Sequence, residues 1–259
     1  MKKIIFFGNG PLADYALAVL KADSDIEIIF HAHDKEDLAR VCELKRENPD
    51  AHGVLASFGV LIKSDVLELF EPEGILNVHP SLLPLYRGAS PIESAILNGD
   101  TEFSVSVMKL VKAMDAGPIY YQTTLPNLPL NKSAIYEVLA KTGAEWIVAH
   151  FNDLPEPSLQ DDSKATFCGK LEKSDGILTP ETDTAEQTFR KIVAFQGFPK
   201  PKYTFFGIPC IILEAHILKP SETAVLKMEC ASGALAIDRL QPEGRKAMDA
   251  KSFLNGYGK

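Results

Sequence analysis

The first 150 residues alternate short apolar runs with stretches of helical periodicity, and this alternation constrains the fold more than any other feature of the sequence. Each apolar run has the length and composition of a buried strand, whereas each periodic stretch repeats apolar residues at intervals of three or four positions. A regular alternation of strand and helix is typical of a mostly parallel sheet covered on both faces. The sequence therefore predicts an α/β, doubly wound, Rossmann-like first domain.

The two patterns locate the individual elements of this domain. The predicted strands are Lys3–Phe7, Ile26–His31, Gly53–Phe58, Gly74–Val78, Ser104–Leu110 and Ile119–Thr124, and the predicted helices are Leu12–Lys21, Lys35–Arg46, Ser64–Phe70, Ser90–Leu97 and Lys132–Phe151.

A different pattern follows the Pro- and acid-rich stretch 153–176. One amphipathic helix, Thr184–Phe195, precedes short β-rich runs that are separated by Gly and Pro turns. Such runs favour a small OB-like β-barrel. The runs are Tyr203–Phe206, Cys210–Ile217, Val225–Glu229 and Leu235–Leu240. We predict a first, α/β domain at 1–155, a linker at 156–176 and a β-barrel domain at 177–259.

Composition excludes several classes of protein. The net charge is −8, with 13 Lys and Arg against 22 Asp and Glu in residues 1–160 and 14 against 13 in residues 161–259, so the chain is no bulk-basic nucleic-acid binder. The four cysteines and six histidines show no metal-ligand spacing, so we expect no metal and no disulfide framework. No apolar run approaches the roughly 20 residues of a membrane span, and we expect a cytoplasmic monomer.

The turn Gly8–Ala13 has the spacing G-x-G-x-x-A of dinucleotide-binding folds and lies between a predicted strand and a predicted helix. An acid should end the second strand to bind the ribose of a dinucleotide, but no acid follows that strand until Asp34. We therefore favour a tight structural turn here. The alternative in which the protein is not an enzyme is a nucleotide-binding regulator that uses this turn.

Polar residues stand at the carboxyl end of the predicted strand Gly74–Val78, where open α/β sheets bind their ligands. Asn77 and His79 project on one face because side chains alternate along a strand. An amide donor beside an imidazole can stabilise the oxyanion of acyl transfer, and the imidazole can also carry a proton. Asp115, in a loop between two later strands, is either the acid that completes the site or a turn-forming residue.

Two adjacent runs carry a resemblance to a known family. Ser81–Pro84 and Arg87–Ile92 together resemble the SLLPxxRGAxPI signature of methionyl-tRNA formyltransferases. Leu240–Met248 looks like the LQPxGKKxM segment of the same family, and Phe195–Pro199 stands where its members have an FNPxP-like turn. The resemblance thus covers nearly the whole chain.

The resemblance implies a reaction and a set of site residues. The formyl group of 10-formyltetrahydrofolate would pass to the α-amine of methionyl initiator tRNA, with Asn77, His79 and Asp115 as the catalytic trio and no metal. A cis peptide is implied at Leu83–Pro84. The residues implied to contact the folate are Phe58, Gly59, Leu61, Ser81, Leu82, Leu83, Pro84, Lys112, Ala113 and Met114.

One departure from the family concerns the acceptor. The basic loop that usually follows the second strand is missing, because the chain runs from His31 through Asp34 directly into a helix. Candidate tRNA contacts are then Arg87, Lys200 and Lys202, although Arg87 could instead brace its loop. The alternative enzyme is a folate-dependent N-formyltransferase acting on an amino-sugar nucleotide or another small amine.

Overall fold

The computed structural model describes residues 1–258, which form two compact units. The first unit comprises Met1–Ile92 and Thr101–Gly169. The second comprises Glu93–Asp100 and the chain from Lys170 on. Residues 156–169, which the sequence assigns to a linker, belong to the first unit.

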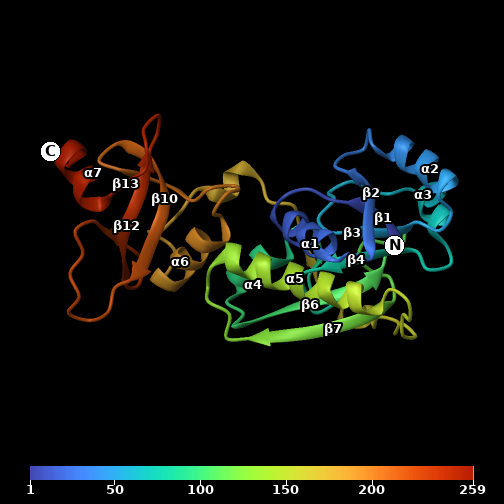
Figure 1. The fold of residues 1–259 in the computed structure, drawn as a ribbon. Helices are drawn as coiled ribbons and strands as arrows, with labels where there is room; N and C mark the ends of the chain where they lie inside the picture. Colours follow the sequence, from blue (N-terminus) through green and yellow to red (C-terminus); the bar gives the residue numbers. More distant parts are fainter. Residues whose placement is uncertain (259) are drawn as a thin grey trace. The chain divides into compact units, whose positions relative to one another are not determined.

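The first unit is built on a six-stranded sheet with the order β2-β1-β3-β4-β6-β7 (Figure 1). Strands β1 to β4 are parallel, whereas β6 and β7 are antiparallel to their neighbours. This arrangement confirms the predicted mostly parallel sheet. The strands are β1 (Lys2–Phe7), β2 (Ile26–Ala32), β3 (His52–Leu55), β4 (Ile75–His79), β6 (Glu102–Lys109) and β7 (Ile119–Pro126).

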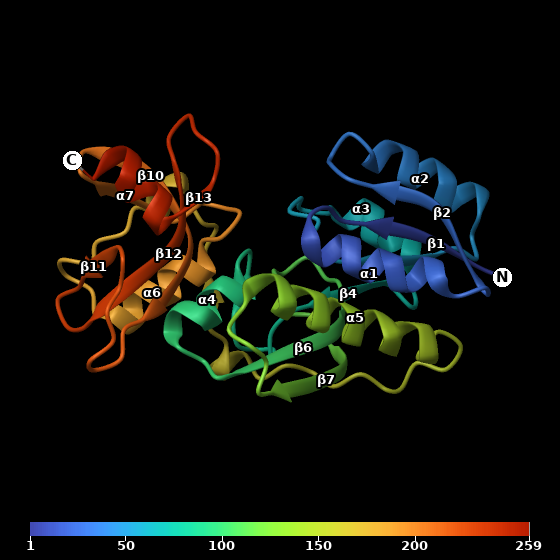
Figure 2. The same cartoon turned by 60° about the vertical axis from the view of Figure 1, so that its left-hand side comes forward.

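Helices cover both faces of this sheet. In Figure 2 α1 (Pro11–Ala22) and α5 (Lys132–His150) lie together against one face, and α2 (Leu38–Glu47) lies on the opposite side. The short α3 (Ser64–Leu67) continues as a 3-10 turn over Glu68–Phe70. On the α2 side, alternate residues of β1 pack with helix residues in one apolar core, which contains Ile5, Phe7, Val41, Val66, Phe70 and Ile75.

Some predicted boundaries differ from the structure for local reasons. Helix α2 begins at Leu38 rather than Lys35, because the Asp34 carboxylate accepts the N–H groups of Glu36 and Asp37 and holds a turn there. Strand β3 ends at Leu55 because Ser57 and Gly59 adopt positive φ. Two two-residue strands that pair with each other, β5 (Arg87–Gly88) and β8 (Phe167–Cys168), are too short for their sequences to show a period.

The second unit is an antiparallel β structure, as predicted, with strand order β11-β12-β10-β9 and β13 paired to β12. Its apolar core includes Ile212, Leu235, Leu240 and Phe253. A capping box between Thr184 and Gln187 starts its main helix. The elements are α4 (Pro91–Asn98, which begins in the first unit), α6 (Ala185–Ala194), β9 (Lys202–Phe205), β10 (Ile208–Ile217), β11 (Lys227–Glu229), β12 (Ala234–Pro242), β13 (Met248–Asp249) and α7 (Ala250–Tyr257).

Helix α5 approaches β4 closely because Gly143 has no side chain. A Cβ atom at this position would lie 2.6 Å from Val78 Cγ1 and 3.2 Å from Val105 Cγ2. Val78 is a stiff β-branched residue in the middle of the sheet, so it cannot turn aside without cost. Gly143 therefore fixes the depth at which α5 packs on the strand that carries Asn77 and His79.

We expect Gly143→Ala to lower the free energy of unfolding of the first unit by up to about 2 kcal/mol. Alanine adds up to about 1 kcal/mol of helix propensity, but overpacking of a closed core costs about 1–3 kcal/mol. Urea unfolding measures the change. Gly256→Ala is the matched control, because no side chain among residues 1–258 lies within 4 Å of the Cβ that this helical glycine in α7 would gain. A Gly143→Ala protein at least as stable as the wild type would contradict the account.

Candidate active site

Strand β4 is buried along its whole length between β3 and β6. Val78 contacts α5, whereas Ile75 faces the opposite core with Phe70. By the two-residue period, Asn77 and His79 share the face of Ile75. Only 4% of Asn77 and 5% of His79 is exposed. The strand thus places two polar side chains in an otherwise apolar layer.

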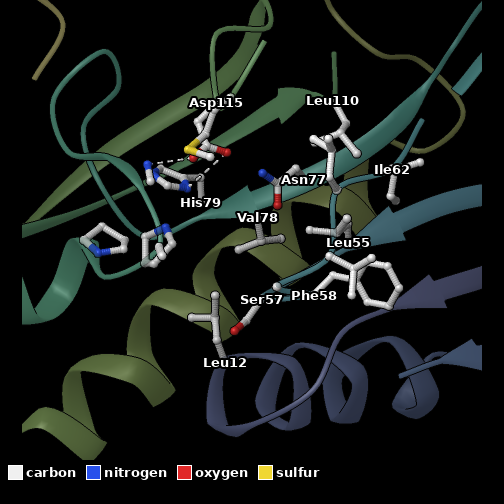
Figure 3. Close-up of a pocket in the computed structure, with 18 of the residues that line it drawn as sticks. Leu12, Leu55, Ser57, Phe58, Ile62, Asn77, Val78, His79, Leu110 and Asp115 are labelled. Atoms are coloured by element: carbon white, nitrogen blue, oxygen red, sulfur yellow. Dashed lines mark hydrogen bonds and ion pairs between the residues drawn. The ribbon is translucent and has the colours of Figure 1, made fainter. Parts of the chain in front are cut away.

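A pocket of about 300 Å³ opens beside these two residues (Figure 3). It lies where α1 begins and where β3 and β4 end, and the loop between β6 and β7 forms another wall. Figure 3 shows Asn77, His79 and Asp115 on one side of the pocket and Leu12 with Ser57 on the other. The pocket therefore combines one polar side with an apolar remainder, as small-molecule sites commonly do.

The contacts of His79 decide which of its nitrogens serves the pocket. Its Nε2 atom lies 3.0 Å from the carbonyl oxygen of Tyr86. Because a carbonyl can only accept, Nε2 carries the hydrogen of this bond. Its Nδ1 atom lies 3.8 Å from Asp115 Oδ1, which is an ion-pair distance and too long for a direct hydrogen bond. Nδ1 is therefore the nitrogen available for chemistry.

Asn77 and Asp115 complete the polar side of the pocket. Among residues 1–258, the Asn77 side-chain amide has no hydrogen-bond partner, and it lines the pocket although little of the residue is exposed. Asp115 Oδ2 accepts the backbone N–H of Gly88 at 2.8 Å. Asp115 also has a positive φ of 48°, and strained backbone of this kind clusters at functional sites. The polar side of the pocket thus presents an amide donor without a partner among the described residues, an imidazole, and a carboxylate held by a backbone hydrogen bond.

Gly88 allows the close packing that holds Asp115. A Cβ atom at this position would lie 2.1 Å from the carbonyl oxygen of Cys168, on the paired strand β8. Only glycine lets β5 approach β8 this closely while its N–H group reaches the carboxylate.

This arrangement suits the transfer of an acyl group. Asn77 and a protonated His79 can both donate hydrogen bonds to an oxyanion, and Asp115 can balance the charge of the imidazolium. Within residues 1–258, no cluster of three or more His, Cys, Asp or Glu side chains has the arrangement of a metal site. No helix in the same residues has the length and apolar character that crossing a bilayer requires.

Comparison with known proteins identifies the family. The sequence profile described as "Formyl transferase" matches residues 12–150, and the one described as "Formyl transferase, C-terminal domain" matches residues 170–258. The chain belongs to the formyl transferase family. The resemblance seen in the sequence is thereby confirmed.

Individual relatives resemble this formyltransferase in sequence or in fold. The methionyl-tRNA formyltransferase of Granulibacter bethesdensis is 35% identical over 221 residues, covering 81% of this chain and 69% of that protein. HypX from Aquifex aeolicus, solved in complex with tetrahydrofolic acid, has a TM-score of 0.76 at 18% identity and covers 100% of this chain, which spans only 48% of HypX. The methionyl-tRNA formyltransferase from Clostridium thermocellum has a TM-score of 0.67 at 16% identity, covering 96% of this chain and 99% of that one.

The structure brings some predicted site residues of the formyltransferase together and separates others. Asn77, His79 and Asp115 meet at one side of the pocket. Of the residues implied to contact folate, Phe58, Gly59, Leu61, Lys112 and Met114 line the pocket, whereas Ser81, Leu82, Leu83, Pro84 and Ala113 are not among its lining residues.

The Ser81–Pro84 turn is held by hydrogen bonds to a buried serine on β6. Ser106 Oγ donates to the Ser81 carbonyl at 2.6 Å and accepts the N–H of Leu83 at 3.2 Å. The Gln122 amide donates to both Ser106 Oγ and the Leu83 carbonyl. The Leu83–Pro84 peptide is cis, as the resemblance predicts. These contacts support the loop that follows His79.

The three candidate tRNA residues lie in different surroundings. Arg87 is buried, and its guanidinium bonds to Gln160 and Asp162 within the first unit. Lys200 and Lys202 are exposed in the second unit. Of the two roles considered for Arg87, these contacts support the bracing of its loop.

Sequence reasoning missed several residues at or beside the pocket. Leu12 and Tyr136 line it from α1 and α5. The position of Leu12, in the first turn of the helix that follows the first strand, could have indicated this, because ligands bind at the carboxyl edge of such sheets. Gln160 binds the loop of Asp115, and its place in a predicted linker gave no signal of this contact.

We expect Ser106→Ala to lower the free energy of unfolding of the first unit by about 1–3 kcal/mol, because it leaves buried donors and an acceptor without partners. Urea unfolding tests this against Ser104→Ala on the same strand, whose hydroxyl contacts Thr124 at a half-buried site. Equal effects of the two substitutions would show that the network under the Ser81–Pro84 turn adds nothing.

Proposed function

We propose that this formyltransferase moves the formyl group of 10-formyltetrahydrofolate to the α-amine of methionyl initiator tRNA. The observation that carries the chemistry is the Asn77 amide, which lines the pocket with no partner among the described residues and lies beside His79 and Asp115. The curated relatives named methionyl-tRNA formyltransferase, which align over about four fifths of this chain, support the acceptor.

The reaction assigns a task to each member of the trio. The α-amine attacks the formyl carbon, so that a new C–N bond forms and the carbonyl electrons move to oxygen. Asn77 and the Nδ1–H of protonated His79 donate to that oxyanion. Asp115 balances the imidazolium and passes the amine proton, by way of water, to N10 of the folate. The bond from the formyl carbon to N10 then breaks, leaving formylated methionyl-tRNA and tetrahydrofolate.

The apolar part of the pocket is the proposed folate site. Phe58, Leu61 and Met114 offer apolar surface to a flat pterin ring, and Gly59 and Lys112 lie beside them. Leu61 and Met114 remain 72% and 62% exposed, which makes them available at the rim. We assign the Ser81–Pro84 turn the task of supporting the loop after His79.

The acceptor is held without a basic loop after β2. Residues 33–37 join β2 directly to α2, and the Asp34 and Asp37 carboxylates bond within this connection. Lys200 and Lys202 are then the proposed phosphate contacts in the second unit. An amino-sugar nucleotide as acceptor is the alternative that this short connection leaves to be tested.

We expect His79→Ala and Asn77→Ala each to lower kcat on the order of a hundredfold, because each removes one donor to the oxyanion. Folate affinity should change far less, since the apolar contacts proposed for the folate do not include Asn77 or His79. Steady-state formylation and a separate folate-binding titration measure the two quantities. His216→Ala, at an exposed histidine of the second unit, is the matched control. Near-normal turnover by His79→Ala refutes the mechanism.

Binding of methionyl-tRNA should depend only weakly on salt, because few basic residues are available for phosphates. When the logarithm of the binding constant is plotted against the logarithm of the salt concentration, each neutralised phosphate contributes roughly −0.9 to the slope. Lys200→Ala combined with Lys202→Ala should raise KM for charged initiator tRNA and make this slope shallower. Should the double variant formylate tRNA normally while the wild type prefers an amino-sugar nucleotide, the acceptor assignment is wrong.

A further inference from the structure

The Gln160 side chain connects the loop of Asp115 to Arg87. Its Nε2 atom donates to the carbonyl oxygens of Asp115 and Gly117, at 2.8 and 2.7 Å. Its Oε1 atom accepts from Nε and Nη2 of Arg87, at 3.0 and 2.7 Å. All these residues belong to the first unit. The contacts span 43 to 73 positions of sequence, so they join segments that only the fold brings together.

The hydrogen-bonding capacity of the Gln160 amide is fully used. A side-chain amide has two N–H donors and one oxygen with two lone pairs, and each of these finds a partner here. The guanidinium fixes the oxygen toward Arg87 and, by polarising the amide, strengthens the donation to the two carbonyls. A carboxylate of the same length could bind Arg87 but could not donate to the carbonyls.

The segment around Gln160 is itself held in place. Ser158 and Ile119 exchange both backbone hydrogen bonds at 2.8 Å. Further on, the N–H groups of Tyr86 and Arg87 donate to the Thr166 hydroxyl and carbonyl. Residues 158–168 therefore form a strap that is bonded at both ends to the rest of the first unit. The strap directs Gln160 at the loop of Asp115.

Asp115 needs this support because its backbone is in the left-handed region, at φ 48°. A residue in that region persists when its surroundings determine it. Gln160 restrains the carbonyl groups of Asp115 and Gly117, while Gly88 N–H restrains the carboxylate. Without Gln160, the backbone carbonyls of Asp115 and Gly117 would lose their side-chain donor, and the carboxylate's bond to Gly88 and its long contact with His79 would have to hold the loop in place.

We propose that Gln160 is a positioning residue for formyl transfer and that Arg87 is its anchor. Gln160 does not line the pocket, so it acts through Asp115 by keeping the carboxylate aligned with His79 Nδ1. The inference rests on the role proposed above for Asp115. Within the strap at residues 158–168, it assigns this positioning role to Gln160 alone.

A double-mutant cycle in kcat tests the inference. Gln160→Ala should lower kcat about tenfold in the wild-type background, with KM for folate changed less than about threefold. In the Asp115→Asn background the same substitution should change kcat less than about twofold, because residues that act through one another are not additive. Asn tolerates positive φ, so Asp115→Asn preserves the loop conformation. Additive losses overturn the inference, since they show that Gln160 acts independently of Asp115.

Two further variants separate positioning from folding. Gln160→Glu keeps a partner for Arg87 and should remain folded at the assay temperature, as far-UV circular dichroism would show, yet it should lose kcat at least as strongly as Gln160→Ala, because it places a carboxylate against two carbonyl oxygens. Asp162→Asn is the matched control: it removes the charge of the exposed partner of Arg87 without touching Gln160, and should leave kcat within twofold. Wild-type activity of Gln160→Glu overturns the inference alone. If Asp115→Asn itself retains full activity, the proposed role of Asp115 fails and the inference fails with it.

Discussion

The burial of β4 on both faces, combined with the two-residue period of a strand, is the constraint on which the first unit depends. One face must pack closely enough on α5 that Gly143 has no room for a side chain beside Val78. The other face must carry the polar residues Asn77 and His79 and keep them accessible to a ligand in the pocket. The close packing on one side holds the strand rigid, and that rigidity fixes the positions of the two polar groups on the other.

The loops around β4 hold their conformations through many bonds rather than through regular structure. Ser57, Tyr86 and Asp115 all have positive φ, and each belongs to a segment at or beside the pocket. Such conformations cost about 1–3 kcal/mol each, so neighbouring contacts must offset them. The Thr166 contacts do so for the loop of Tyr86, and the side chain of Gln160 does so for the loop of Asp115.

The sequence predicted what depends on local patterns and missed what depends on long-range pairing. Strand β4 and the same-face pair Asn77 and His79 followed from apolar runs and strand period, and Asp115 followed from the family resemblance. The absence of Ser81–Pro84 from the lining of the pocket did not follow, because the buried Ser106 that holds this turn lies on another strand. Strands β5 and β8 are two residues long and about 80 positions apart, so neither period nor proximity in sequence could reveal them.

The strap must be inherited together with the site residues Asn77, His79 and Asp115 if the loop of Asp115 is to keep its support. The two regions that match the family profiles, residues 12–150 and 170–258, leave the strap between them. A recombination that joined a new C-terminal domain directly after residue 150 would keep Asn77, His79 and Asp115 but discard Gln160 and the partner of β5. For the same reason, a comparison of relatives confined to the two matched regions would pass over variation at the residue that holds the loop of Asp115.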